Sequence, residues 1–247
     1  MSVNLCIDWG NTNVKAAVFT NDKISNYFAI PQAEAKEKIS SVVGLFNPDK
    51  AILCAVGDVK KDVDQFIGDR INSYIHMDGN TPLPIHNAYL SNDTVGPDRL
   101  ALVAAAHAME PDKNSLVISM GTCITYNFIT RNKTFRGGAI SPGMNMRLKA
   151  MHHFTHLLPE VEAEGDVLLL GYDTATCMRS GTVFGIVAEV DGILSQYESA
   201  YPDFNAILTG GDAPYFAGRL KNRIFADPDL LLKGLNLILN HNVPTPR

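Results

Sequence analysis

The 247-residue chain lacks several features that would assign it at once to a familiar class of protein. It has no excess of basic residues: 21 Lys and Arg stand against 26 Asp and Glu, and the net charge of −5 argues against nucleic-acid binding. It has no apolar run near the roughly 20 residues needed to cross a bilayer. Its first residues, MSVNLCIDWG, lack the basic and apolar regions of a signal peptide, so a cytoplasmic protein is expected.

Cysteine is also scarce, and no two cysteines form a CxxC pair. The four cysteines are Cys6, Cys54, Cys123 and Cys177. Reduced, mostly buried thiols are therefore expected rather than a disulfide framework.

Two nucleotide-binding motifs are absent as well. Without GxxxxGK(S/T) a P-loop kinase is disfavoured, and without GxGxxG after a strand a Rossmann dinucleotide enzyme is disfavoured.

Three histidines near the middle of the chain invite comparison with a metal site. His152 and His156 stand at positions i and i+4, which share one face of a helix. No Glu-x-x-His pattern or nearby cysteine supplies further ligands. We therefore expect His152, His153 and His156 to be surface or interface residues rather than metal ligands.

The chain divides into two halves of a length that suits small domains. Glu110–Asn114 is a polar break that contains Pro111, and we predict domains at 1–113 and 114–247. Apolar runs bounded by turn residues predict strands at 3–7, 14–19, 51–56, 115–119, 123–129 and 206–208. Helices are predicted at 33–46, 62–73, 98–109, 144–158, 175–195, 214–221 and 230–240, and 136–143 is predicted to be a glycine-rich loop.

Each half opens with the same pattern: a β run, a turn that contains glycine, and a second β run. In the first half the pattern is Ile7–Asp8–Trp9–Gly10–Asn11–Thr12, and in the second it is Ile118–Ser119–Met120–Gly121–Thr122. This repeat predicts two similar α/β halves with a cleft between them, each starting with a turn of a size that suits a phosphate group.

The first turn has the residues of a phosphate-binding hairpin. Gly10 allows a ligand to approach the backbone closely, and the N–H groups of residues 11–13 are suited to phosphate oxygens. Asp8 is suited to holding a magnesium ion through water, and Lys15 is suited to meeting negative charge. The alternative is an ordinary hairpin with Asn-Thr-Asn turn residues.

A second candidate site is the segment Gly96–Pro97–Asp98–Arg99. Pro97 suits the first turn of a helix, which places Asp98 where the helix dipole keeps its carboxylate ionised. Such a carboxylate can orient a substrate hydroxyl and accept its proton during phosphoryl transfer. Arg99 is suited to pairing with a carboxylate or phosphate. The alternative is that Asp98 only stabilises the start of the helix.

Two further glycine-rich segments follow. Thr209–Gly210–Gly211–Asp212 comes after a predicted strand, and its glycines allow a flat ligand such as adenosine to lie against the backbone. Gly137–Gly143 precedes a predicted helix whose first amides are suited to an anion. The alternatives are a tight strand–helix turn for the first segment and a plain connection for the second.

Taken in order, these segments resemble the type III pantothenate kinases, which belong to the superfamily of acetate and sugar kinases, Hsp70 and actin. The resemblance covers nearly the whole chain and implies an α/β fold of two duplicated ribonuclease-H-like domains with an ATP cleft between them. It also implies transfer of the ATP γ-phosphoryl group to the terminal hydroxyl of pantothenate, the first step toward coenzyme A. The motifs that carry the resemblance are IDWGNTNVK at 7–15, GPDR at 96–99, GTCIT at 121–125, GGAISPG at 137–143, LTGGD at 208–212 and DPDLLLKGL at 227–235.

The resemblance implies a role for each matching residue. Asp98 is the expected general base, Tyr89 matches the family's pocket tyrosine, and Thr174 matches its substrate-side threonine. The residues expected to contact pantothenate also include Gly96, Pro97, Asp98 and Arg99. Those expected to hold ATP are Asp8, Trp9, Gly10, Asn11, Thr12, Asn13, Val14, Lys15 and Thr122. The family usually works as a homodimer, requires magnesium, and in many members also uses a monovalent cation such as potassium or ammonium.

Two positions depart from the family pattern. The second hairpin usually reads Asp-x-Gly-Thr, with the Asp associated with the monovalent cation, but here that position is Ser119. Asn92 stands where a proline is common. Ser119 therefore leaves open a catalytically weakened binding or regulatory protein of the same fold. A kinase for another small hydroxylated acid is a further alternative.

Overall fold

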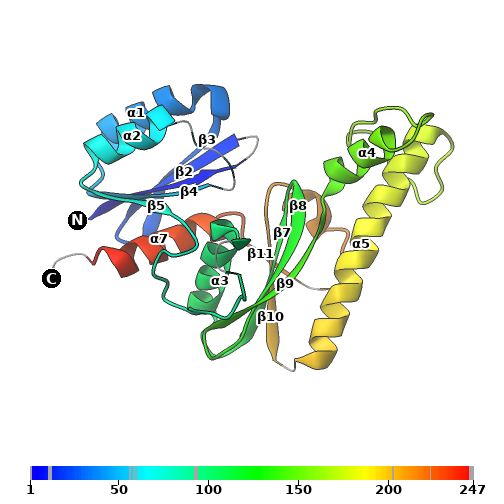
Figure 1. The fold of residues 1–247 in the computed structure, drawn as a ribbon. Helices are drawn as coiled ribbons and strands as arrows, with labels where there is room; N and C mark the ends of the chain where they lie inside the picture. Colours follow the sequence, from blue (N-terminus) through cyan, green and yellow to red (C-terminus); the bar gives the residue numbers. More distant parts are fainter. Residues whose placement is uncertain are drawn as a thin grey trace. The chain divides into compact units, whose positions relative to one another are not determined.

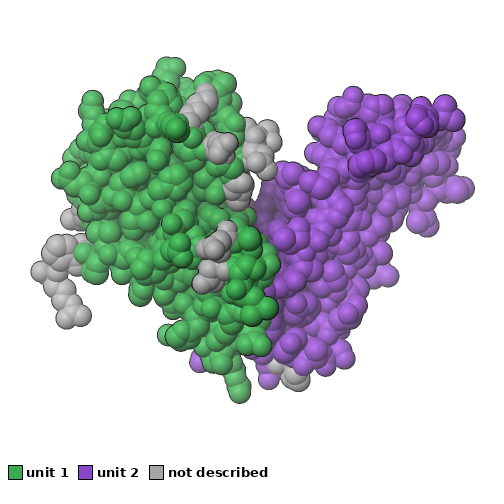
Figure 2. Space-filling model, viewed as in Figure 1, with its two compact units in different colours: residues 1–111, 129–136, 229–247 green, residues 112–128, 137–228 purple. Residues whose placement is uncertain are grey.

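The computed structural model describes residues 2–10, 13–55, 57, 59, 61–91, 94–201, 203–222 and 224–244. The chain forms two compact units (Figure 2): unit 1 comprises residues 1–111, 129–136 and 229–247, and unit 2 comprises residues 112–128 and 137–228. The first boundary between them, at 111/112, lies within the polar break of the sequence, whereas the segments 129–136 and 229–247 return to unit 1.

Unit 1 is built on a five-stranded sheet with the order β3-β2-β1-β4-β5. The first three strands form an antiparallel meander, and the last two add to β1 as parallel strands. The strands are β1 (Val3–Trp9), β2 (Asn13–Thr20), β3 (Lys23–Pro31), β4 (Lys50–Ala55) and β5 (Ser73–Met77). The remaining elements are η1 (Gln32–Glu34), α1 (Ala35–Phe46), α2 (Lys61–Arg70), β6 (His86–Asn87), α3 (Pro97–Met109) and α7 (Leu230–Asn242).

Helices cover both faces of this sheet (Figure 1). Leu5, Ile7 and Trp9 belong to a buried apolar cluster that includes residues of α1 and α2. Asn4 faces the other side, where its Nδ2 donates to Oδ1 of Asn236 in α7 at 2.6 Å. Because alternate strand residues share a face, Asp8 lies on the same side as Asn4, which is the side that α7 and α3 cover.

The second sheet has the order β11-β10-β7-β8-β9-β6. Its strands in chain order after β6 are β7 (Asn114–Met120), β8 (Cys123–Ile129), β9 (Thr134–Pro142), β10 (Phe204–Thr209) and β11 (Phe225–Ala226). The helices of unit 2 are α4 (Met144–His153), α5 (Thr174–Ala200) and α6 (Ala213–Ala217). The tip of the β8–β9 hairpin, residues 129–136, belongs to unit 1, where β6 pairs with it.

The two sheets share one topology. The strand order β9-β8-β7-β10-β11 repeats the order β3-β2-β1-β4-β5. The opening strands β1 and β7 have seven residues each and the same alternation of burial, so that Asp8 and Ser119 are both half-buried penultimate residues. The predicted α/β fold with two duplicated domains is therefore confirmed.

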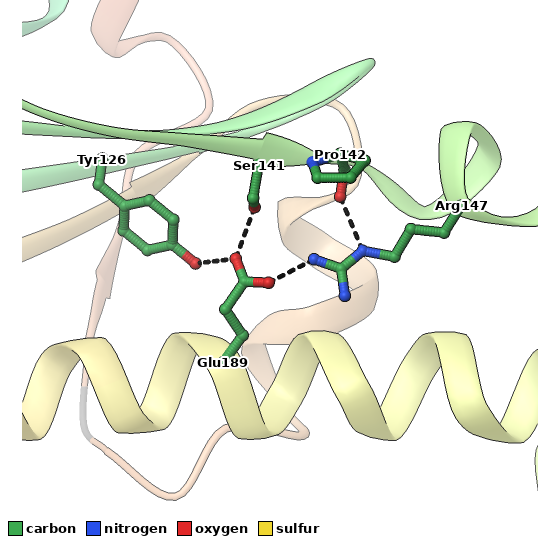
Figure 3. A network of polar contacts seen from close by, with 5 residues as sticks. All are labelled: Tyr126, Ser141, Pro142, Arg147 and Glu189. Carbon is green, nitrogen blue, oxygen red and sulfur yellow. Dashed lines mark hydrogen bonds and ion pairs between the residues drawn. The ribbon is translucent and has the colours of Figure 1, made fainter. Parts of the chain in front are cut away.

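A polar network fixes the helices of unit 2 to its sheet (Figure 3). Glu189 of α5 accepts hydrogen bonds from the hydroxyls of Tyr126 at 2.8 Å and Ser141 at 2.5 Å, and forms an ion pair with Arg147 of α4. Nε of Arg147 donates to the Pro142 carbonyl oxygen at 2.8 Å. Burial raises the pKa of Glu189, but its hydrogen bonds outweigh burial and hold that pKa below the usual range.

The structure corrects the prediction of a glycine-rich loop at 136–143, because most of this segment belongs to strand β9. Its glycines serve close packing: Gly138 has φ +151° and lies where a Cβ atom would clash with the Tyr126 carbonyl oxygen. The helix predicted at 144–158 was also too long, since α4 ends at His153.

Among the described residues, no helix is both long and apolar enough to cross a membrane.

Candidate active site

Asp8 occupies the end of β1 in unit 1, between two neighbouring strands. In the strand register it lies opposite Lys15 of β2 and Cys54 of β4. Burial raises the pKa of Asp8 to about 7, an effect that the nearby Asp98 carboxylate reinforces and the Lys15 ammonium group opposes. An acid that titrates near neutrality next to a second carboxylate is typical of a functional site.

Asp98 lies in the first turn of α3, which begins at Pro97 after the extended residue Gly96. Burial raises the pKa of Asp98, while the Arg99 backbone N–H and guanidinium group act in the opposite direction. Asp8 and Asp98 both raise the pKa of the buried Cys54 thiol, after the larger effect of its burial. Unit 1 therefore brings the proposed base and the proposed phosphate-hairpin carboxylate into one electrostatic cluster.

Among the described residues, two hydrogen bonds hold the ends of the hairpin turn after β1. The Gly10 N–H donates to the Asn13 carbonyl oxygen at 3.2 Å, and Nε2 of Gln32 donates to the Gly10 carbonyl oxygen at 2.6 Å. Asn13 is exposed, whereas Val14 is buried opposite Trp9. The predicted ATP contacts at Asn11 and Thr12, and the departure at Asn92, lie outside the described residues.

Arg99 is buried at 5% exposure, an unusual state for an arginine. Its Cζ atom lies 5.5 Å from the ring centroid of Tyr89 and 5.7 Å from that of Phe135. The two rings are stacked, with centroids 5.9 Å apart and planes 15° apart. The structure thus joins the predicted substrate residues Tyr89 and Arg99 in one cation–π cluster within unit 1.

Unit 2 gathers three of the glycine motifs around the turn after β7. Ser119 pairs in register with Thr209 of β10, and the Asp212 N–H donates to the Met120 carbonyl oxygen at 3.0 Å. Gly210 has φ +100° and packs so closely on Met120 that a Cβ atom would clash with its carbonyl oxygen. The Gly143 N–H donates to the Thr122 carbonyl oxygen at 3.0 Å.

Thr174 is placed on a different element of unit 2, as the first residue of α5. Its side chain is exposed, and the preceding Asp173 caps the helix by accepting from the Thr176 N–H at 2.7 Å. The helix start at this position therefore has a structural explanation in Asp173. The substrate role of Thr174 stays a prediction.

The donor atoms near Asp8 suit magnesium better than a metal with a full set of protein ligands. Among the described residues, no group of three or more His, Cys, Asp and Glu side chains is placed to hold a metal ion. Magnesium usually keeps several water ligands and binds through one or two carboxylates plus substrate phosphates, so the Asp8 carboxylate fits this ion. His152 is exposed, and its Nδ1 lies 2.7 Å from the Leu158 carbonyl oxygen.

Three residues at the candidate site were missed in the sequence. Cys54 lies within the strand predicted at 51–56, but its place beside Asp8 depends on the parallel pairing of β1 with β4. Gln32 reaches the Gly10 turn from the start of η1, directly after β3, a strand that was not predicted. Phe135 reaches the Tyr89–Arg99 pair from a hairpin tip. All three depend on long-range pairing, which local sequence patterns do not encode.

Solved structures define the class of fold to which the chain belongs. A Baf family protein from Campylobacter jejuni matches with a TM-score of 0.58 at 20% identity, covering 96% of this chain and 98% of the other. A protein from Sinorhizobium meliloti, assigned as a 2-dehydro-3-deoxygalactonokinase, matches with a TM-score of 0.54 at 13% identity, covering 98% of this chain and all of the other. The chain thus shares its duplicated α/β fold with these two proteins.

The family follows from the sequence comparisons. The family model for type III pantothenate kinase matches residues 4–196. A type III pantothenate kinase from Bacteroides fragilis is 42% identical over 241 residues, which cover 97% of this chain and 98% of the relative. The chain therefore belongs to the type III pantothenate kinase family, and the resemblance seen in its motifs is confirmed.

Proposed function

We propose that this protein phosphorylates pantothenate with ATP, giving 4′-phosphopantothenate in the first step of coenzyme A biosynthesis. Family membership supports the choice of substrate. The observation that supports catalysis by this chain is the cluster of Asp8, Asp98 and Lys15 at the ends of β1, β2 and α3. Because the reaction consumes ATP, we place it in the cytoplasm.

Asp98 acts as the general base in this proposal. Its carboxylate accepts a hydrogen bond from the terminal hydroxyl of pantothenate and takes its proton as the oxygen attacks the γ-phosphorus of ATP, and the bond from that phosphorus to the bridging oxygen breaks to release ADP. Burial raises the pKa of Asp98, which makes the carboxylate a better proton acceptor than an exposed aspartate. Arg99, held by Tyr89, pairs with the pantothenate carboxylate and fixes the distance to the reacting hydroxyl.

The phosphate groups of ATP are bound by backbone N–H groups and by local charges. The turn after β1 supplies N–H donors, and Lys15 supplies a positive charge beside Asp8. Within unit 2, the turn at Gly121 and Thr122 is the corresponding turn of the second half, and the Thr122 carbonyl oxygen accepts from the Gly143 N–H. Asp8 would hold a magnesium ion, which would supply further positive charge against the phosphate oxygens.

This chain lacks the carboxylate that the family pattern associates with the monovalent cation. Ser119 occupies the same place in β7 as Asp8 occupies in β1, and a neutral hydroxyl binds a cation far less well than a carboxylate. We therefore predict that turnover changes less than about twofold when sodium is replaced by potassium or ammonium. Ser119→Asp is predicted to create a dependence on these cations.

An assay of the purified protein with magnesium-ATP and pantothenate tests both points. Formation of phosphopantothenate, detected by mass, supports the proposed function, and repeating it in sodium, potassium and ammonium salts tests the role of Ser119. Binding of ATP and pantothenate without product would favour a regulatory protein instead. Turnover with another small hydroxylated acid but not with pantothenate would assign a different substrate. A strong potassium requirement in the unaltered chain would contradict the inference from Ser119.

A homodimer is the proposed assembly. Six large apolar side chains are exposed on residues 154–172 of unit 2, the segment that connects α4 to α5. Such a concentration on one short segment is typical of a surface that another protein chain covers. These residues are Phe154, Leu157, Leu168, Leu169, Leu170 and Tyr172.

A further inference from the structure

The tip of the β8–β9 hairpin carries one aromatic residue that behaves unlike its neighbours. Arg131, Asn132 and Lys133 are exposed, as expected of a hairpin tip, whereas Phe135 is fully buried. Its ring stacks on Tyr89 and lies against the Arg99 guanidinium group. Formation of the hairpin alone does not explain why the Phe135 ring is buried against Tyr89 and Arg99.

Backbone pairing holds the hairpin tip and the Tyr89 segment together. The His86 N–H donates to the Lys133 carbonyl oxygen at 2.8 Å, and the Ala88 N–H donates to the Phe135 carbonyl oxygen at 3.1 Å. Oδ1 of Asn87 then accepts a hydrogen bond from the Tyr89 N–H at 3.0 Å. The place of Phe135 therefore sets the place of the Tyr89 ring as well as the surroundings of Arg99.

We propose that Phe135 is a positioning residue for substrate recognition: with Tyr89 it holds the Arg99 guanidinium in the orientation that pairs with a substrate carboxylate. This inference rests on the proposed function. Aromatic rings attract a guanidinium group through its flat faces, while its N–H donors lie in its plane. The Arg99 guanidinium group can therefore stack on Phe135 and pair with a carboxylate at the same time. The stacking also limits the rotation of the Arg99 side chain before substrate binds.

Phe135→Leu keeps an apolar side chain in this place but removes the ring. A cation–π contact of ordinary strength predicts a rise of about 5- to 20-fold in the KM for pantothenate. The kcat and the KM for ATP should change less than about twofold, because the ring of Phe135 acts on Tyr89 and Arg99. In an Arg99→Ala background, Phe135→Leu should add no further rise in KM, because Phe135 acts through Arg99.

Phe128→Leu is the matched control, since Phe128 is a buried hairpin phenylalanine that packs on Tyr197 and Tyr201 instead. It should leave the KM for pantothenate unchanged. Thermal unfolding of each variant checks that it is folded, and if Phe135→Leu fails to fold, Phe135→Met replaces it. The inference would be overturned if Phe135→Leu raised the KM for pantothenate equally in the original and the Arg99→Ala backgrounds, or did not raise it at all. Either result would leave the proposed function intact. Absence of turnover in both the unaltered chain and the control would overturn both.

Discussion

At the residue scale, Asp8 is a proposed site residue whose burial lowers the stability of the folded protein. Burial at the end of β1 raises its pKa to about 7, whereas an aspartate in the unfolded chain titrates near 4. The folded protein therefore holds a proton that the unfolded chain has lost between about pH 4 and pH 7, and stability falls as the pH rises through this interval. Above about pH 7 the folded state contains a carboxylate in an unfavourable environment, next to Asp98.

Replacing Asp8 by Asn is predicted to stabilise the protein while impairing function. The free energy of unfolding at pH 8 should rise by about 1–2 kcal/mol, less than the full pKa shift implies because the side chain is only half-buried. The gain should shrink as the pH is lowered toward 4. Magnesium-dependent binding of ATP should weaken at the same time, since the carboxylate that fits the ion is gone.

Denaturant unfolding of the two proteins at pH 8 and pH 5 measures the gain, and quenching of the single tryptophan, Trp9, reports binding. A variant that is less stable than the original at pH 8 would contradict the raised pKa.

At the element scale, patterns within one element were predictable and contacts between elements were not. The apolar run of β1, the helix start at Pro97 and the turn at Gly10 follow from local rules, and the structure has all three. The segment 136–143 was predicted as a loop because glycine usually marks turns. Gly138 is instead required by the close approach of β9 to the Tyr126 backbone, which depends on a partner strand. The place of Asp98 in the first turn of α3 was predictable, but its proximity to Asp8 was not.

Glu189 gives a prediction for the attachment of α5 and α4 to the sheet. Glu189→Gln removes the charge that pairs with Arg147 and accepts from Tyr126 and Ser141. The free energy of unfolding at pH 7 should fall by about 1–3 kcal/mol, because a part-buried network loses its charged acceptor. Since the pKa of Glu189 is lowered in the folded state, its contribution is present above the unfolded value and is lost as the pH falls through the folded value.

Unfolding curves from pH 7 to pH 3 test this prediction, with Glu198→Gln as the control, because Glu198 is an exposed residue of the same helix. The difference between Glu189→Gln and the original should narrow only as the pH falls below the usual range of a glutamate, because the lowered pKa of Glu189 keeps the folded-state carboxylate ionised until then. An equal difference at every pH would show that charge is not the cause.

At the scale of the whole molecule, the duplication was visible in the sequence, whereas the return of the last segment was not. The echo of residues 7–12 at 118–122 predicted two α/β halves, and both units have the same strand order. Helix α7 belongs to unit 1, where Gly234 packs on the backbone of Ala101 in α3. That contact joins segments far apart in the chain, so no local pattern indicated it. The homodimer and its surface likewise remain predictions.

The proposed dimer surface can be tested with Leu169→Asp and Leu170→Asp, made together. Charged side chains at exposed apolar positions of an interface should shift the protein from dimer to monomer at micromolar concentration. Leu45→Asp in α1, a similarly exposed apolar position of unit 1, should leave the dimer intact. Sedimentation equilibrium measures the masses. A dimer that persists in the double variant would place the interface elsewhere.

The most direct test of the central claim is a comparison of the original protein with Asp98→Asn. Turnover of magnesium-ATP and pantothenate should fall by about 10²- to 10⁴-fold, because the variant cannot accept the hydroxyl proton. The affinity for ATP, followed by Trp9 fluorescence, should change less than about threefold, since the phosphate turn is untouched. Full turnover by Asp98→Asn would contradict the assignment of Asp98 as the base of this kinase.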